Sequence, residues 1–139
     1  MIPESIGKLL AVLALGACVV TSPATAAQSK GTGKPQLNVR VSPPTGFVPF
    51  RAAFPAELVG GANDYEDYYC ARVEWDWADE TRSEAGYDCG PYEKGKSEIR
   101  RRFTQEHTFR VPGNFEVTFR LKQGSKVVAA AKVMVQVRD

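Results

Sequence analysis

A strict alternation of apolar and polar side chains in residues 114–122 most constrains the fold of this chain. The apolar positions are Phe115, Val117, Phe119 and Leu121, and the intervening positions are Glu116, Thr118, Arg120 and Lys122. A period of two is typical of a strand with one buried face in an antiparallel sheet. Pro112 and Gly113 precede this strand and predict a tight turn after residues 107–109.

Other segments of the chain show the same alternation. They are residues 37–41, 50–54, 73–77, 98–103 with a weak inward pattern, and 127–137, where every odd position is apolar. Turn-rich sequences such as SPPTG and GGANDYED separate them, and no segment has a helical period of useful length. Six or seven short strands with turn signals between them predict an all-β antiparallel sandwich.

The first 27 residues have the composition of an export signal. Lys8 precedes an apolar run, and Pro23 and the small residues 24–27 follow it. The run is too short for a good transmembrane helix. Cys18, in the sequence Leu-Gly-Ala-Cys, leaves lipoprotein cleavage and lipidation as a second route, and an uncleaved anchor as a third. We therefore expect a secreted or periplasmic protein, or one that is lipid-anchored to the envelope through Cys18.

The remaining sequence divides into a linker and one domain. Residues 28–36 are polar, glycine-rich and basic, which predicts a flexible linker. Residues 37–139 have the length of a single domain. Cys70 and Cys89 remain after either cleavage, and in an oxidising compartment they are expected to form a disulfide. A disulfide that closes the loop between Cys70 and Cys89 is expected to stabilise the folded domain by about 3 kcal/mol.

Three motifs in this domain occur in a recognisable order. Residues 42–58 read SPPTGFVPFRAAFPAEL, residues 75–80 read WDWADE, and residues 107–118 contain HTF, PG and FEVT. In these motifs the chain resembles the PKD domain, an immunoglobulin-like sandwich of bacterial surface and secreted proteins. The resemblance spans residues 37–137 and implies that Trp75 and Trp77 lie in the core. It also implies that His107 has a structural role, tying a strand to a loop.

The sequence departs from the PKD pattern after Trp77. Ala78 and Glu80 stand where the motif has glycines, which permit a positive φ in a tight turn. This departure predicts a rebuilt, longer loop, and we expect the Cys70–Cys89 disulfide to hold it.

Acidic and aromatic residues gather in this region. Residues 64–88 contain nine acidic and two basic residues, and all five tyrosines lie between residues 65 and 92. Tyrosines in loops are common in recognition surfaces. We therefore predict a surface that binds a protein or a carbohydrate at the cell envelope. Its candidate residues are Tyr68, Tyr69, Glu80, Tyr87 and Tyr92. A loop that only packs on its own sheet edge is the alternative.

Two charged clusters suggest other roles. Asp76, Asp79 and Glu84 are weak candidate ligands for Ca²⁺, although their spacing is not that of an EF-hand. The basic run at residues 100–102 predicts an edge strand kept soluble by charge, or a patch for an anionic glycan or lipid head group. The excess of acidic residues nearby speaks against a nucleic-acid partner.

No catalytic motif is present in the sequence. We expect a module that is not an enzyme and needs no cofactor, unless Ca²⁺ binds the acidic loop. A structural or spacer domain without a specific ligand remains the alternative to recognition.

Overall fold

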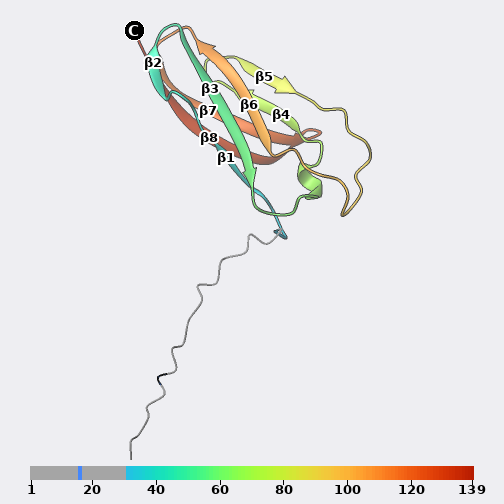
Figure 1. The fold of residues 1–139 in the computed structure, drawn as a ribbon. Helices are drawn as coiled ribbons and strands as arrows, with labels where there is room; N and C mark the ends of the chain where they lie inside the picture. The colour runs from blue at the N-terminus through green and yellow to red at the C-terminus, as the bar shows by residue number, and fades with distance from the viewer. Residues whose placement is uncertain (1–15, 17–30) are drawn as a thin grey trace, which may run out of the picture.

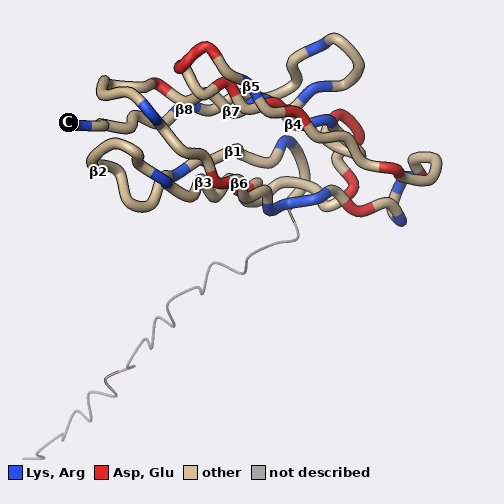
Figure 2. Tube along the Cα trace, turned by 90° about the horizontal axis from the view of Figure 1, so that it is seen from above, with Lys and Arg blue, Asp and Glu red and all other residues tan. Residues whose placement is uncertain are grey.

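The computed structural model describes Gly16 and residues 31–139, which contain eight strands in two sheets (Figure 1). The three-stranded sheet has the order β1-β3-β6, and the five-stranded sheet has the order β2-β8-β7-β4-β5. The strands are β1 (Gln36–Val39), β2 (Thr45–Phe47), β3 (Phe50–Val59), β4 (Arg72–Asp76), β5 (Arg82–Ala85), β6 (Arg102–Phe109), β7 (Gly113–Gln123) and β8 (Lys126–Arg138). Figure 2 shows the sheets as two layers. The predicted all-β sandwich is confirmed.

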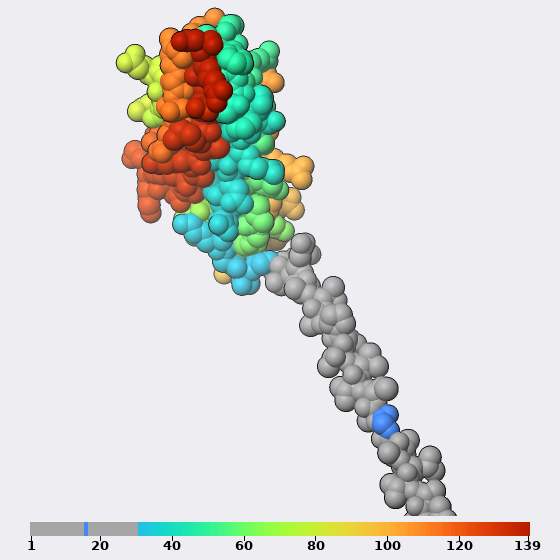
Figure 3. Space-filling model, turned by 90° about the vertical axis from the view of Figure 1, so that its left-hand side faces the viewer, coloured from blue at the N-terminus to red at the C-terminus, as the bar shows by residue number. Residues whose placement is uncertain are grey.

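The predicted signal peptide, Cys18 and residues 28–30 lie outside the described residues. Within the described part of the chain, no helix is long and apolar enough to cross a membrane. The only regular helical segment in that part is the short 3-10 helix η1 (Glu66–Tyr68). The described part of the domain begins at residue 31, which lies at the end of the sandwich opposite the C-terminus (Figure 3).

The alternating segment forms β7, which pairs with β4 on one side and β8 on the other. The apolar side chains predicted to share a face, Phe115, Val117, Phe119 and Leu121, are all buried. The core also contains Trp75 and Trp77, whose rings stack in parallel with centroids 5.2 Å apart. Phe54 of the other sheet meets the Trp77 ring edge-on at 5.0 Å. The prediction that both tryptophans are core residues is confirmed.

The predicted inward face of the last strand is wrong at its start. Val127 is 45% exposed, although it shares odd parity with the buried Val135. A β-bulge lies between Leu121 and Lys122 on the pairing with β8, so that Ala129 pairs with Leu121 and Val127 with Lys122. The extra residue, Val128, shifts the parity of the strand.

β3 is longer than predicted because Pro55 does not end it. The Pro55 carbonyl accepts a hydrogen bond from the backbone N–H of Arg40 (2.9 Å), beyond the last residue of β1. Pro55 therefore lies where the neighbouring strand has ended, and its missing N–H removes no bond within the β1–β3 ladder.

The C-terminal part of the predicted flexible linker is ordered, which corrects the boundary at residue 36. Pro35 is buried, and the Gly33 carbonyl accepts a hydrogen bond from the backbone N–H of Ala62 (2.8 Å). Gly61 has a φ of 65°, and a Cβ there would lie 2.3 Å from the nitrogen of Pro35. A glycine is thus required where residues 31–35 cross the loop after β3.

The sequence pattern does not predict β2 and β5. β2 has three residues and lies within a segment rich in proline and glycine. β5 carries no large apolar side chain, since its four residues are Arg-Ser-Glu-Ala. Both strands lie at the edges of the five-stranded sheet, where pairing is set by the neighbouring strand rather than by burial.

Candidate binding groove

A long segment, residues 86–101, connects β5 to β6 across the two sheets. The predicted disulfide is present, and it joins Cys89 of this segment to Cys70, which follows η1. The two Cα atoms lie 6.0 Å apart. The disulfide therefore holds the first part of the connecting segment against the chain just before β4.

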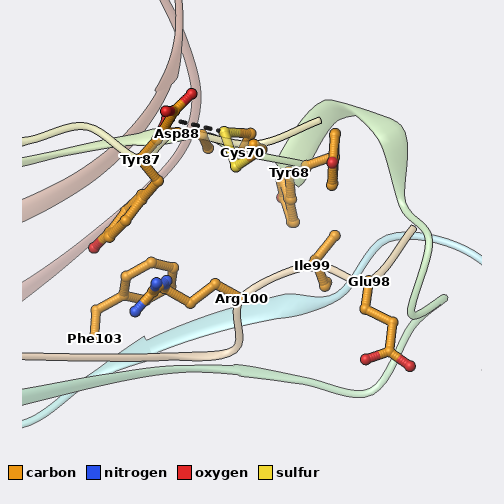
Figure 4. Close-up of a pocket in the computed structure, with 11 residues that line it drawn as sticks. Tyr68, Cys70, Tyr87, Asp88, Glu98, Ile99, Arg100 and Phe103 are labelled. Atoms are coloured by element: carbon orange, nitrogen blue, oxygen red, sulfur yellow. Dashed lines mark hydrogen bonds between the residues drawn. A yellow bond between two sulfur atoms is a disulfide. The ribbon is translucent and has the colours of Figure 1, made fainter. Parts of the chain in front are cut away.

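A groove of approximately 520 Å³ lies beside this disulfide (Figure 4). It is lined by Tyr68, Tyr69, Cys70, Ala71, Tyr87, Asp88, Cys89, Glu98, Ile99, Arg100 and Phe103. These residues come from η1, the start of the chain leading to β4, the connecting segment and β6. We call this the Cys70–Cys89 groove.

The groove has an apolar floor and a charged rim. Tyr68, Ile99 and Phe103 are buried side chains of the floor. Asp88, Glu98 and Arg100 are exposed residues of both charges. An apolar floor surrounded by a few polar groups is the usual composition of a site that takes one apolar group and orients it.

The Arg100 guanidinium lies over the Tyr87 ring, with its central carbon 4.0 Å from the ring centroid (Figure 4). This is cation–π geometry, which holds both side chains at the groove wall. One face of Tyr87 is therefore occupied by Arg100.

Two other candidate tyrosines use their hydroxyls within the domain. The Tyr69 hydroxyl donates to the carbonyl of Gly90 (2.7 Å), and the Tyr92 hydroxyl donates to the carbonyl of Asp64 (2.5 Å). Their rings pack together at 5.5 Å. These contacts fasten the connecting segment to the loop after β3. Tyr92 is not among the residues that line the groove.

Burial raises the pKa of the Tyr68 phenol, and the nearby Tyr65 and Asp67 raise it further. Tyr68 therefore stays protonated and neutral at physiological pH. It contributes apolar surface to the groove floor and does not act as a base there.

The turn after Trp77 is short, so the predicted longer loop is wrong at this point. The backbone N–H of Trp77 donates to the carbonyl of Thr81 (3.2 Å), and β5 begins at the next residue. Ala78 has a φ of 62° and Glu80 a φ of 71°. Both residues adopt the left-handed conformation that glycine would favour, so the turn is kept without its glycines. Glu80 is exposed and does not line the groove.

His107 joins the two sheets at this turn. Its Nε2 lies 2.7 Å from Oδ2 of Asp79, and its ring stacks on Trp77 at 4.3 Å. Asp79 also accepts hydrogen bonds from the backbone N–H and hydroxyl of Thr81. Burial alone would raise the pKa of Asp79, but the bonds from Thr81 and His107 outweigh it and lower the pKa. These contacts agree with the structural role that the resemblance implies for His107.

The candidate Ca²⁺ ligands do not converge. Asp76 pairs with Arg82 and Arg120, Asp79 with His107, and Glu84 with Arg72. Among the described residues, no three His, Cys, Asp or Glu side chains lie close enough together to hold a metal ion. Each of these carboxylates instead has a basic partner.

A buried charge that the sequence pattern does not single out lies on the outer face of the five-stranded sheet. Glu74 is 5% exposed and accepts hydrogen bonds from Arg120 (2.9 Å) and Lys122 (3.2 Å). Burial alone would raise its pKa, but the hydrogen bonds and positive charges of Lys122 and Arg120 lower it. Arg120 of β7 lies directly opposite Glu74 of β4, and Lys122, which pairs with Arg72, is the diagonal neighbour of Glu74.

The three arginines predicted to share an edge strand have different roles. Arg100 contacts Tyr87 at the groove. Arg101 donates from Nη1 to the carbonyls of Leu58 (3.1 Å) and Gly60 (2.8 Å), so it fastens the loop after β3. Only Arg102 lies in β6, and its side chain is exposed. The prediction of one charged edge strand is therefore correct for Arg102 alone.

Sequence reasoning missed Glu98, Ile99 and Phe103 as groove residues. The available signal was Ile99, a large apolar side chain between the charged residues Glu98 and Arg100. The groove also depends on the fold, because η1 and β6 are brought together across the sandwich.

No protein-family model matches the sequence, and no curated protein is similar to it. Among solved structures, the chain is similar to the PKD domain of an M14-like peptidase from Thermoplasmatales archaeon SCGC AB-540-F20. The TM-score is 0.53 at 12% identity, over 78% of this chain and 100% of that one. The chain has the immunoglobulin-like fold of a PKD domain.

A second solved structure similar to this PKD-like fold is the CARDB domain of the PF1109 protein from Pyrococcus furiosus. The TM-score is 0.48 at 15% identity, over 78% of this chain and 92% of that one. The similarity to the solved PKD domain confirms, for the fold, the resemblance predicted from the three sequence motifs.

Proposed function

We propose that this PKD-like domain is a non-catalytic recognition module that binds a protein through the Cys70–Cys89 groove. The observation that carries the proposal is the groove itself. It has an apolar floor of Tyr68, Ile99 and Phe103 and a rim that carries both charges. A disulfide and several tyrosine hydrogen bonds hold its walls in place, which reduces the entropy lost on binding.

A protein ligand fits this groove better than a carbohydrate. Sugar binding by stacking needs an aromatic ring with an open face, and Arg100 covers one face of Tyr87. Tyr69 and Tyr92 pack on each other. An apolar side chain of a partner protein, flanked by polar groups, matches an apolar floor with charged residues around it.

We further propose that the module works outside the cytoplasm, secreted or periplasmic, or anchored through Cys18. The disulfide supports this location, since disulfides persist in oxidising compartments. The composition of residues 1–27 supports it independently.

Binding to a peptide display library and to a glycan array tests the proposed ligand class. The protein is expected to enrich peptides and to leave the glycan array unlabelled. Arg100→Glu places a negative charge at the groove rim and removes the cation from Tyr87. It should weaken binding of the enriched peptides by about tenfold or more.

Arg110→Glu is the matched control, because Arg110 is an exposed arginine in the turn before β7 and does not line the groove. It should leave peptide binding within about twofold of the original. Glycan labelling without peptide enrichment would replace the proposal by carbohydrate recognition. Binding to neither would favour a spacer domain.

A further inference from the structure

We infer that the open edge of β6 takes an extended segment of a partner protein as a fourth strand of the three-stranded sheet. This inference rests on the proposed recognition role, and it identifies how the partner's backbone is held next to the groove. β6 is an edge strand, and the described part of the chain has no strand beyond it. Its first residues adjoin the groove, since Phe103 belongs to both.

The backbone of β6 presents a regular row of hydrogen-bonding groups at this edge. The backbone N–H of Leu58 donates to the carbonyl of Arg101 (2.8 Å), so bonds to β3 fall on the odd-numbered residues. Because bonding direction alternates along an antiparallel strand, the even-numbered residues direct their N–H and C=O groups outward. These residues are Arg102, Thr104, Glu106 and Thr108.

One of these outward groups has a partner in the described residues. The carbonyl of Glu106 accepts a long hydrogen bond from the side-chain amide of Gln105 (3.3 Å). The Gln105 side chain is exposed, so it can be displaced by a stronger backbone donor. The other outward groups have no hydrogen-bond partner among the described residues, which is the template that strand addition requires.

Two inward-facing side chains indicate that the place beside β6, where a fourth strand would lie, is unfilled. Gln105 pairs across with the buried Phe54, and Ala85 of β5 pairs with the buried Val73. Both therefore point to the inner side of the sandwich, yet both are exposed. β5 projects beyond the edge of β6 in Figure 1, with no strand of the other sheet opposite it.

The unfilled position is one strand wide, which favours a single segment over a second copy of this domain. β6 already lies over β4, because His107 stacks on Trp77 directly after that strand. The β6 strand of a second copy would bring its own β4 into the space that β5 occupies. An extended segment carries no second layer and avoids this overlap.

The side chains around the position define the chemistry of the segment. Alternate residues would face Ala85 and Gln105, and these should be small or apolar. The residues between them would lie beside Arg102, Thr104 and Glu106. Glu106 already pairs with Arg51, whereas Arg102 has no side-chain partner among the described residues. We therefore expect about seven alternating residues with an acidic side chain next to Arg102.

Display-library peptides bound to the full protein test the inference. Thr104→Pro removes one outward N–H without touching the bonds to β3, and it should weaken binding of enriched peptides by about tenfold. Thr104→Val keeps the N–H and the branched side chain, and it should bind within about twofold of the original. Enriched peptides should alternate apolar and polar residues and should carry an acidic residue at one polar position. Arg102→Glu should weaken the binding of peptides with that acidic residue.

N-methylated peptides supply an arm that needs no protein variant. Methyl groups on the backbone nitrogens of the peptide that face β6 remove the hydrogen bonds to that strand and should abolish binding. Methyl groups on the alternate nitrogens, which face away from β6, should not. Equal binding of both methylated forms, or of Thr104→Pro and the original, would overturn strand addition. If Arg100→Glu still weakens those peptides, the groove proposal stands while strand addition fails. Enrichment of no peptide would overturn both.

Discussion

At the scale of single residues, the turn after Trp77 is formed by residues that do not favour its backbone conformation. Ala78 and Glu80 have positive φ values of 62° and 71°. The turn is held by Asp79, which binds Thr81 and His107. The sequence motif predicts the position of this turn correctly. It cannot predict that the turn survives without glycine, because one of the contacts that hold Asp79 comes from His107, a residue 28 positions away.

Glycine at either of these two positions should stabilise the domain. Ala78→Gly and Glu80→Gly each relieve a left-handed backbone and should raise the free energy of unfolding by about 0.5–1 kcal/mol. Denaturant unfolding measures the change. Ala85→Gly, in β5 without a positive φ, is the control and should lower it instead. A loss of stability in the first two variants would show that the turn is not strained.

The stability of the domain should fall in acid. The pKa values of Asp79 and Glu74 are both lowered in the folded protein. Each ionised carboxylate therefore stabilises the folded protein fully at a pH above the ordinary carboxyl pKa of about 4. This stabilisation is lost as the pH falls through the lower pKa that the group has in the folded protein. Thermal unfolding between pH 7 and pH 2 should show this decline.

Asp79→Asn and Glu74→Gln together should flatten that decline, and each should cost about 1–3 kcal/mol at neutral pH because a charged hydrogen-bond acceptor is removed. Glu116→Gln is the control, since its carboxylate is exposed in a pair with Lys132. An unchanged pH profile in the double variant would contradict the assignment of these two carboxylates.

At the scale of elements, strands with one buried face were predictable, and the two edge strands of the five-stranded sheet were not. β7 follows its alternation closely, and β8 follows it after the bulge at Val128. β5 and β2 carry no such alternation and depend on their neighbours for pairing. The groove was predictable only in part. Tyr68, Tyr69 and Tyr87, which the sequence offers as binding candidates, line the groove, whereas Ile99 and Phe103 reach it through the fold.

The disulfide should matter more to the connecting segment than to the sheets. Cys70→Ser with Cys89→Ser should lower the free energy of unfolding by about 3 kcal/mol. Hydrogen exchange should speed up in residues 86–101 and stay slow in β7, which is paired on both sides. Equal loosening of both regions would show that the disulfide supports the whole sandwich.

At the scale of the whole molecule, the aromatic core and the proposed binding surfaces lie in different parts of the sandwich. The core of stacked aromatic rings lies between the two sheets. The groove and the open edge of β6 lie together on the side where the three-stranded sheet is one strand short of covering β5. This arrangement leaves one side of a rigid domain free to bind a partner.

Site-specific photo-crosslinking in the native cells tests the central claim, that the Cys70–Cys89 groove binds a protein. Glu98→benzoylphenylalanine places the reactive group on the groove rim, and Arg110→benzoylphenylalanine places it on an exposed turn away from the groove. We predict a discrete protein adduct from position 98, absent from position 110 and reduced by Arg100→Glu. Adducts of equal yield at both positions, or none at position 98, would contradict the claim.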